Sequence, residues 1–415
     1  MLTVDISRSA RRIALTLFVA QSLGSAGFIA AATLSSILGA KLGGEAGWAG
    51  VPTAIYLLGA AGAAFLWGYL MDAIGRRSAI AAGLALGVIG AGLAFGAAAS
   101  GSLGWFLGAM ALMGVAYAAL TLGRFAAAEV QPPEARGRAI SNMVIGGAVG
   151  AVVGPLLVSP AGQLARLSGV DELAGAYAAS LVLFAVAGAI VLVGLRPDPR
   201  DLGRQVARLF PETSPTAGGT RPVAQILRQP ATMVAVVSMV LGQMVMVMVM
   251  AITALHMRQH QYGLGNISMV MSAHTFGMYG FSVISGRLAD RWGRGPVILS
   301  GSGALLLACL AAPLSPQLLP LALALFLLGL GWNFCFIGGS TLLADQLSPA
   351  ERARTQGFND LLVGLAAVLG SLGSGLIFAS MGFGVTALIG AFITLVPLAY
   401  TVRWLRGQHR GVVER

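Results

Sequence analysis

The stretch Gly68-Tyr69-Leu70-Met71-Asp72-Ala73-Ile74-Gly75-Arg76 returns 218 residues later as Gly286-Arg287-Leu288-Ala289-Asp290-Arg291-Trp292-Gly293-Arg294. A second pattern, made of Glu129, Pro133, Arg136 and Arg138, returns as Asp345, Pro349, Arg352 and Arg354 at an offset of 216 residues. Two independent motifs at nearly the same offset indicate a duplicated chain whose halves share one organisation. Repeats of this kind are typical of membrane transporters.

The composition around these motifs is that of an integral membrane protein. Of the 415 residues, 57% are hydrophobic and 10% are charged, whereas soluble domains carry about 25% charged residues. The long apolar runs predict helices rather than a barrel, and the 58 glycines favour close packing between them. The net charge of +11 comes from arginines in short loops, so we expect no nucleic-acid partner.

Hydropathy predicts an all-α integral membrane fold with twelve transmembrane helices in two six-helix halves. The expected spans are 13–38, 48–70, 78–99, 103–123, 139–165, 174–195, 231–257, 266–289, 296–313, 317–343, 355–381 and 383–405. The expected domains are an N-terminal half (1–195), a cytoplasmic linker (196–230) that is rich in arginine and proline, and a C-terminal half (231–415).

The basic residues predict the orientation of these spans. With twelve crossings, 23 of the 26 lysines and arginines fall on one side, and only Lys41, Arg166 and Arg258 fall on the other. The positive-inside rule therefore predicts that both termini are cytoplasmic. The first apolar stretch is about 26 residues long, which suits a retained span rather than a cleaved signal peptide. Both cysteines, Cys309 and Cys335, lie inside spans, so no disulfide framework is expected.

Two side-chain pairs on adjacent spans have a chemistry of their own. Met246 with Met250, and His274 with Met278, are spaced i, i+4, which puts each pair on one helix face. Thioether and imidazole are ligands that suit Cu(I), and neutral ligands avoid the cost of burying carboxylates in lipid. The expected depths of the pairs overlap near the midplane, where transporter sites lie.

Packing alone could also account for some of these residues. The seventh span holds seven methionines, so an i, i+4 pair arises there readily, and methionine is a common filler of apolar cores. His274 is more informative, because an ionisable residue deep in a span indicates a functional site by default.

The repeated Gly-x-Leu-x-Asp-x-x-Gly-Arg motif resembles the loop motif of the major facilitator superfamily. Within that superfamily, Met246, Met250, His274 and Met278 resemble the ligand pairs of the CcoA-type copper importers. The resemblance implies a transporter in the bacterial inner membrane that imports copper for a haem–copper cytochrome c oxidase. Copper, either bare or bound to a small carrier ligand, would be its substrate, with no resident cofactor. We expect a monomer surrounded by membrane lipid.

Two further groups of residues are candidates. His256, Met257 and His260, at the outer end of the seventh span, could capture metal or simply form a polar cap. The loop motifs are expected to control conformation through charge pairs and helix-end contacts, with topology signalling as the alternative. Their residues are Gly68, Asp72, Gly75, Arg76, Glu129, Arg136, Gly286, Asp290, Gly293, Arg294, Asp345 and Arg352.

One rival interpretation rests on the fifth span. Gly146, Gly150, Gly154 and Pro155 resemble the motif of proton-coupled exporters of drug-like molecules, and they also favour close helix packing and a bend. Such exporters usually carry a carboxylate inside the membrane, and no acidic residue is expected deep inside the first, fourth or fifth span. A membrane sensor without transport is a third alternative, and no constellation indicates an enzyme.

Overall fold

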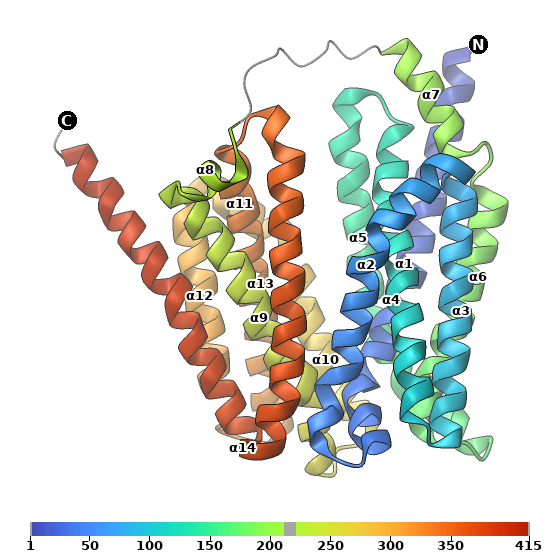
Figure 1. The fold of residues 1–415 in the computed structure, drawn as a ribbon, viewed down its shortest axis with the longest axis vertical. Coiled ribbons are helices and arrows are strands. Elements are labelled where there is room, and N and C mark those ends of the chain that lie inside the picture. Colours follow the sequence, from blue (N-terminus) through green and yellow to red (C-terminus); the bar gives the residue numbers. More distant parts are fainter. Residues whose placement is uncertain (1, 211–220, 414–415) are drawn as a thin grey trace. The chain divides into compact units, whose positions relative to one another are not determined.

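The secondary structure of the described residues in the computed structural model is helical (Figure 1). The structure describes residues 2–210 and 221–413, without the side chains of residues 2–6, 349–350, 352–353 and 408–413. Within these residues, eleven helical segments are long and apolar enough to cross a membrane. The last of them contains two crossings, because Gly382 interrupts it with a φ of 80°, at the boundary predicted between the last two spans. The predicted all-helical membrane fold is confirmed.

The first compact unit contains the helices of the N-terminal half. They are α1 (Leu2–Gly43), α2 (Val51–Ile74), α3 (Arg76–Ser100), α4 (Leu103–Glu129), α5 (Pro133–Leu167), α6 (Gly175–Gly194) and α7 (Pro199–Leu209). The 3-10 turn η2 (Glu172–Ala174) precedes α6. Residues 263–268, at the start of α10, also belong to this unit.

Helices α1 and α5 approach each other closely because glycines line the contact. A Cβ on Gly150 would lie 2.1 Å from the main-chain oxygen of Ser22, and one on Gly154 would lie 2.6 Å from that of Ala26. A Cβ on Gly146 would lie 3.0 Å from the oxygen of Phe18. Pro155 is buried in the same helix. These residues therefore allow backbone-to-backbone packing within the first unit.

The second compact unit contains most of the C-terminal half, together with the 3-10 turn η1 (Ala46–Gly50). Its helices are α8 (Val223–Leu227), α9 (Pro230–Gln259), α10 (Leu264–Tyr279, from residue 269), α11 (Ser282–Trp292), α12 (Arg294–Ala311), α13 (Leu318–Asp345) and α14 (Pro349–Val413). Helix α9 packs against α12, α13 and α14. The predicted eighth span consists of two helices, because the helix is interrupted between Tyr279 and Ser282.

The interval predicted as a linker begins with an amphipathic helix, α7. Asp198 caps it by accepting a hydrogen bond from the Arg200 main-chain nitrogen at 2.9 Å, and Pro199 follows at the first helical position, where it needs no partner. Leu202 and Val206 are buried. The two arginines at the other face, Arg204 and Arg208, are exposed. The middle of the interval, residues 211–220, lies outside the described residues.

Candidate metal site on α9 and α10

One face of α9 carries Met239, Gln243, Met246 and Met250, whose spacing of four, three and four residues aligns them along the helix. The hydroxyl of Ser340 donates to the Met239 sulfur at 3.3 Å. The indole of Trp332 donates to the Gln243 oxygen at 2.6 Å. Both partners lie on α13, so this face of α9 points toward α13.

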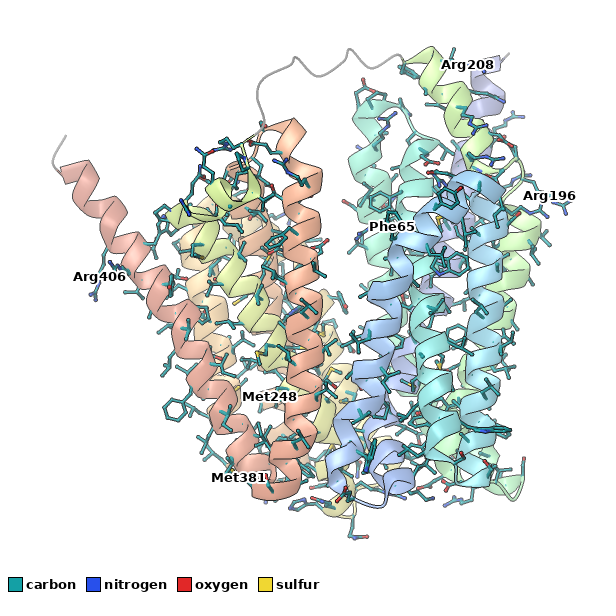
Figure 2. All side chains as sticks on the ribbon, viewed as in Figure 1. Phe65, Arg196, Arg208, Met248, Met381 and Arg406 are labelled. Atoms are coloured by element: carbon teal, nitrogen blue, oxygen red, sulfur yellow. The ribbon has the colours of Figure 1, made fainter. Side chains whose placement is uncertain are left out.

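Met248, labelled in Figure 2, lies two residues from Met246 and from Met250, a spacing that puts it on the opposite face of α9. Its terminal methyl lies 3.3 Å from the position that a Cβ on Gly390 of α14 would take. Met246 and Met248 are 3% and 2% exposed, so burial does not distinguish them. Their directions do: Met246 shares the face that points toward α13 with Met239, Gln243 and Met250, whereas Met248 does not.

His274 is fully buried on α10, with 0% of its surface exposed. Its Nδ1 lies 2.9 Å from the main-chain oxygen of Leu325 on α13. A carbonyl can only accept, so Nδ1 carries the hydrogen and the neutral ring keeps a lone pair on Nε2. That Nε2 is buried and has no hydrogen-bond partner among the described residues. Metal-binding histidines are commonly held in this way, with the second nitrogen donating to a carbonyl.

Met278 lies one turn further along α10, directly before the break in the helix. Its side chain is 7% exposed, and its main-chain oxygen accepts a hydrogen bond from Asn333 Nδ2 at 2.6 Å. Asn333 Nδ2 also lies 3.0 Å from the Ser282 hydroxyl, at the start of α11. An α13 side chain therefore satisfies the backbone that the break leaves open. Broken helices of this kind often line the sites of transporters.

The bond between Gln243 and Trp332 sets the level of α9 relative to α13. The helices are antiparallel, because Met239 contacts Ser340 while Gln243 contacts Trp332. Met250 and Leu325 each lie seven residues, or about 10 Å, from that bond in the same direction. His274, bonded to Leu325, thus lies within about one turn of the level of Met250. Met246 and Met278 lie about one turn closer to the loop-motif end, and α13 is the element that both pairs approach.

The residues at the far end of α9 separate into two groups. The ring of His256 stacks on Phe383 with centroids 4.1 Å apart, and the ring of His260 meets that of His256 edge-on at 4.4 Å. His260 Nδ1 lies 3.0 Å from the His256 main-chain oxygen, and His260 is exposed. Met257 is fully buried. The structure brings the two histidines together, and Met257 points into the core instead.

The loop motifs form the same ion-pair arrangement in each half. Arg76 bonds Asp72 at 2.8 Å and Glu129 at 3.2 Å. In the other half, Arg294 bonds Asp290 at 3.3 Å and Asp345 at 2.9 Å. Charge pairs were expected among the loop-motif residues, and Glu129 and Asp345 find theirs in arginines that lie 53 and 51 residues away.

The motif glycines differ in what they do. Gly75 and Gly293 have φ values of 92° and 91°, a conformation that favours glycine. The two copies of the sequence motif therefore also share this backbone conformation. At Gly68 and Gly286, a Cβ would meet nothing within 4 Å. Arg136 has a partner within the structure, while the side chain of Arg352 lies outside the described residues.

Two acidic residues that the sequence did not single out form hydrogen bonds near the two ends of the predicted linker. Asp198 accepts from the main-chain nitrogens of Arg76 and Arg77 at 3.1 and 3.0 Å. Glu351 is 2% exposed and accepts from Arg221 at 2.9 and 2.8 Å. This Arg221 guanidinium, together with the main-chain nitrogens of Arg221 and Ser348, holds the pKa of the Glu351 carboxyl well below its usual range. The Asp-Pro pair at the start of α7 was a readable capping signal, whereas Glu351 had none.

Comparison with known proteins shows what the chain is similar to. The model of the Major Facilitator Superfamily matches residues 14–269 and 237–413. The uncharacterized MFS-type transporter YdeG of Bacillus subtilis is 34% identical, covering 95% of this chain and 92% of YdeG. The riboflavin transporter RfnT of Brucella anthropi is 28% identical, covering 90% and 91%. The crystal structure of the nucleoside transporter NupG superposes with a TM-score of 0.70 at 18% identity, covering 94% of this chain and 98% of NupG.

Proposed function

The chain belongs to the Major Facilitator Superfamily, and from this premise we propose that it is a transporter of copper, carried as Cu(I). It would work by alternating access and import the ion across the bacterial inner membrane, with both termini in the cytoplasm. The halves 1–195 and 231–415 would be its two moving parts, joined by the linker 196–230. Supply of a haem–copper cytochrome c oxidase would be the purpose of this import.

The state of His274 carries the copper proposal. A buried Nε2 without a hydrogen-bond partner among the described residues is costly unless something binds it. The bond from Nδ1 to Leu325 fixes the ring and leaves Nε2 as the ligating atom. Met250 lies at about the same level, so imidazole and thioether would bind the ion together.

The ligand chemistry supports Cu(I) over other metals. Met246, Met250 and Met278 offer neutral sulfur, which soft Cu(I) prefers over the oxygen ligands that suit manganese or magnesium. Among the described residues, no group of three or more His, Cys, Asp or Glu side chains could hold a metal. A few weak ligands would also let the ion leave, as transport requires.

A planar aromatic solute such as riboflavin is the second candidate. RfnT, which is named for riboflavin, is similar over nearly the whole chain. The ring of Trp332 stacks on Phe336 at 5.0 Å and meets Tyr279 edge-on at 6.1 Å. Aromatic rings beside a polar contact such as Gln243 are typical of sites for flat ligands.

Uptake by cells that lack their own copper and riboflavin importers tests both candidates. The copper proposal expects accumulation of radioactive copper that excess zinc and excess riboflavin leave unchanged. Accumulation of labelled riboflavin without copper uptake would replace it with the second candidate. An Asn333→Ala variant would not separate the two candidate substrates, because Asn333 supports the helix break between α10 and α11, close to both candidate sites.

A further inference from the structure

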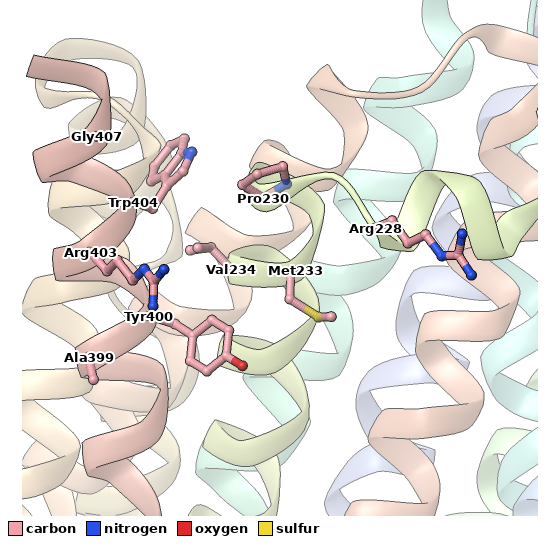
Figure 3. Close-up of a pocket in the computed structure, with 9 residues that line it drawn as sticks. All are labelled: Arg228, Pro230, Met233, Val234, Ala399, Tyr400, Arg403, Trp404 and Gly407. Carbon is pink, nitrogen blue, oxygen red and sulfur yellow. The ribbon is translucent and has the colours of Figure 1, made fainter. Parts of the chain in front are cut away.

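A groove lies at the end of the second unit that carries the loop motifs, between the start of α9 and the end of α14. Its volume is about 790 Å³. Arg228, Met233 and Val234 line one side, and Tyr400, Arg403 and Trp404 line the other. Figure 3 shows Tyr400 and Arg403 pointing from α14 toward Val234 and Met233 of α9. We propose that this groove binds an anionic phospholipid of the inner leaflet.

Charge is the first argument for this ligand. Arg228 and Arg403 are both exposed, and neither has an acidic partner among the residues that the structure describes. By contrast, Arg221 and Arg294 of the same unit are paired with carboxylates. Arg403 points into the groove and can bind a phosphate through charge-assisted hydrogen bonds, whereas Arg228 extends away from Arg403 and adds positive charge at the rim (Figure 3).

The surrounding side chains match the rest of a phospholipid. Tyr400 is 48% exposed and Met233 is 39% exposed, so the apolar floor of the groove is open to an acyl chain. Tyr400 and Trp404 are the residue types that gather at the level of lipid headgroups. A basic pocket between transmembrane helices on the cytoplasmic side is a recurrent site for anionic lipids. A free phosphate would leave the Met233, Val234 and Ala399 surface uncovered.

This proposal does not depend on the cargo of the transporter. The groove is formed by α8, α9 and α14 near residues 228–234 and 399–407, whereas the candidate metal ligands on α9 begin at Met246, about 18 Å further along the helix. A failure of the copper proposal would therefore leave the lipid site standing, and the reverse also holds.

Lipid binding to the purified full-length protein tests the proposal. Retention of dioleoylphosphatidylglycerol is measured by native mass spectrometry, with dioleoylphosphatidylcholine and inorganic phosphate as comparison ligands. The charge variant is Arg228→Gln with Arg403→Gln, and its matched control is Arg204→Gln with Arg208→Gln on the exposed face of α7. A second variant, Ala399→Trp, fills the groove without changing the charge. Melting temperatures without lipid identify any variant that has not folded.

We expect the charge variant to bind phosphatidylglycerol at least about tenfold more weakly, because each surface arginine contributes about fivefold to binding of anionic lipid. Ala399→Trp should weaken it similarly, and the α7 control should match the wild type. Equal binding by all folded variants would overturn the proposal. So would equal affinity for phosphatidylcholine, or a stabilisation that inorganic phosphate alone reproduces.

Discussion

His274 Nδ1 lies 2.9 Å from the main-chain oxygen of Leu325, and this contact fixes the orientation of a buried imidazole ring. Rotation of the imidazole would leave the hydrogen on Nδ1 without its acceptor, and Nε2 has no partner in the described structure. The fixed orientation of the ring depends on this contact between α10 and α13. The spacing of His274 and Met278 alone did not reveal it.

Removing the amide of Asn333 should destabilise the break between α10 and α11. Asn333→Ala would leave the Met278 carbonyl, now 2.6 Å from Asn333 Nδ2, buried without that donor. A lost buried partner costs about 1–3 kcal/mol, so we expect a lower melting temperature and faster proteolysis of the purified protein. Ser340→Ala, on the same helix, is the control. An unchanged melting temperature for Asn333→Ala would show that the break does not need this bond.

Reversing a loop-motif ion pair should be rescued by reversing its partner. Arg76→Glu places a third acid beside Glu129 and Asp72, so we expect a large loss of transport in an uptake assay. The double variant Arg76→Glu with Glu129→Arg restores opposite charges across a contact now 3.2 Å long, and we expect it to recover part of the rate. A double variant no better than the single one would assign Arg76 to topology rather than to conformational control.

The pairing of Glu351 predicts a particular pH dependence of stability. Because the bonds from Arg221 lower the pKa of this carboxyl in the folded protein, its contribution is complete above the unfolded carboxyl pKa of about 4.3. It is lost as the pH falls toward the folded value. The melting temperature of wild type should exceed that of Glu351→Gln by a constant margin from pH 8 to pH 5. The margin should shrink below about pH 4, and a margin that does not change with acid would contradict the pairing.

The contact between α1 and α5 predicts opposite effects of two glycine substitutions in one helix. Gly150→Ala forces a Cβ to within 2.1 Å of the Ser22 oxygen, so we expect reduced stability and yield. Gly137→Ala meets nothing within 4 Å and should be neutral or stabilising by up to about 1 kcal/mol. Melting temperatures of both purified variants check this, and equal effects would mean that the helices separate easily.

The outline of the fold could be predicted from the sequence because hydropathy and repeated loop motifs report directly on spans and duplication. The break in the eighth span could not, since the partner that stabilises it, Asn333, lies 55 residues beyond Met278 on another helix. Charge pairs were expected in the loop motifs, but the sequence did not indicate that Arg76 binds Glu129, because this bond joins two separate helices.

The candidate metal site, too, was predictable from the sequence only in part. The i, i+4 rule placed Met246 with Met250 and His274 with Met278 on common helix faces. It could not say which of seven methionines on α9 face α13, because every residue in an apolar span is a plausible packing residue. The bond of Gln243 to Trp332 supplies that direction.

Copper uptake into liposomes that contain purified protein tests the central claim most directly. Wild type is compared with His274→Ala and with Met248→Ala, a control in which a buried methionine of α9 on the opposite face is removed. The account predicts that His274→Ala takes up Cu(I) at least about tenfold more slowly while Met248→Ala transports normally. Equal uptake by the wild type and His274→Ala, with both proteins folded, would contradict it.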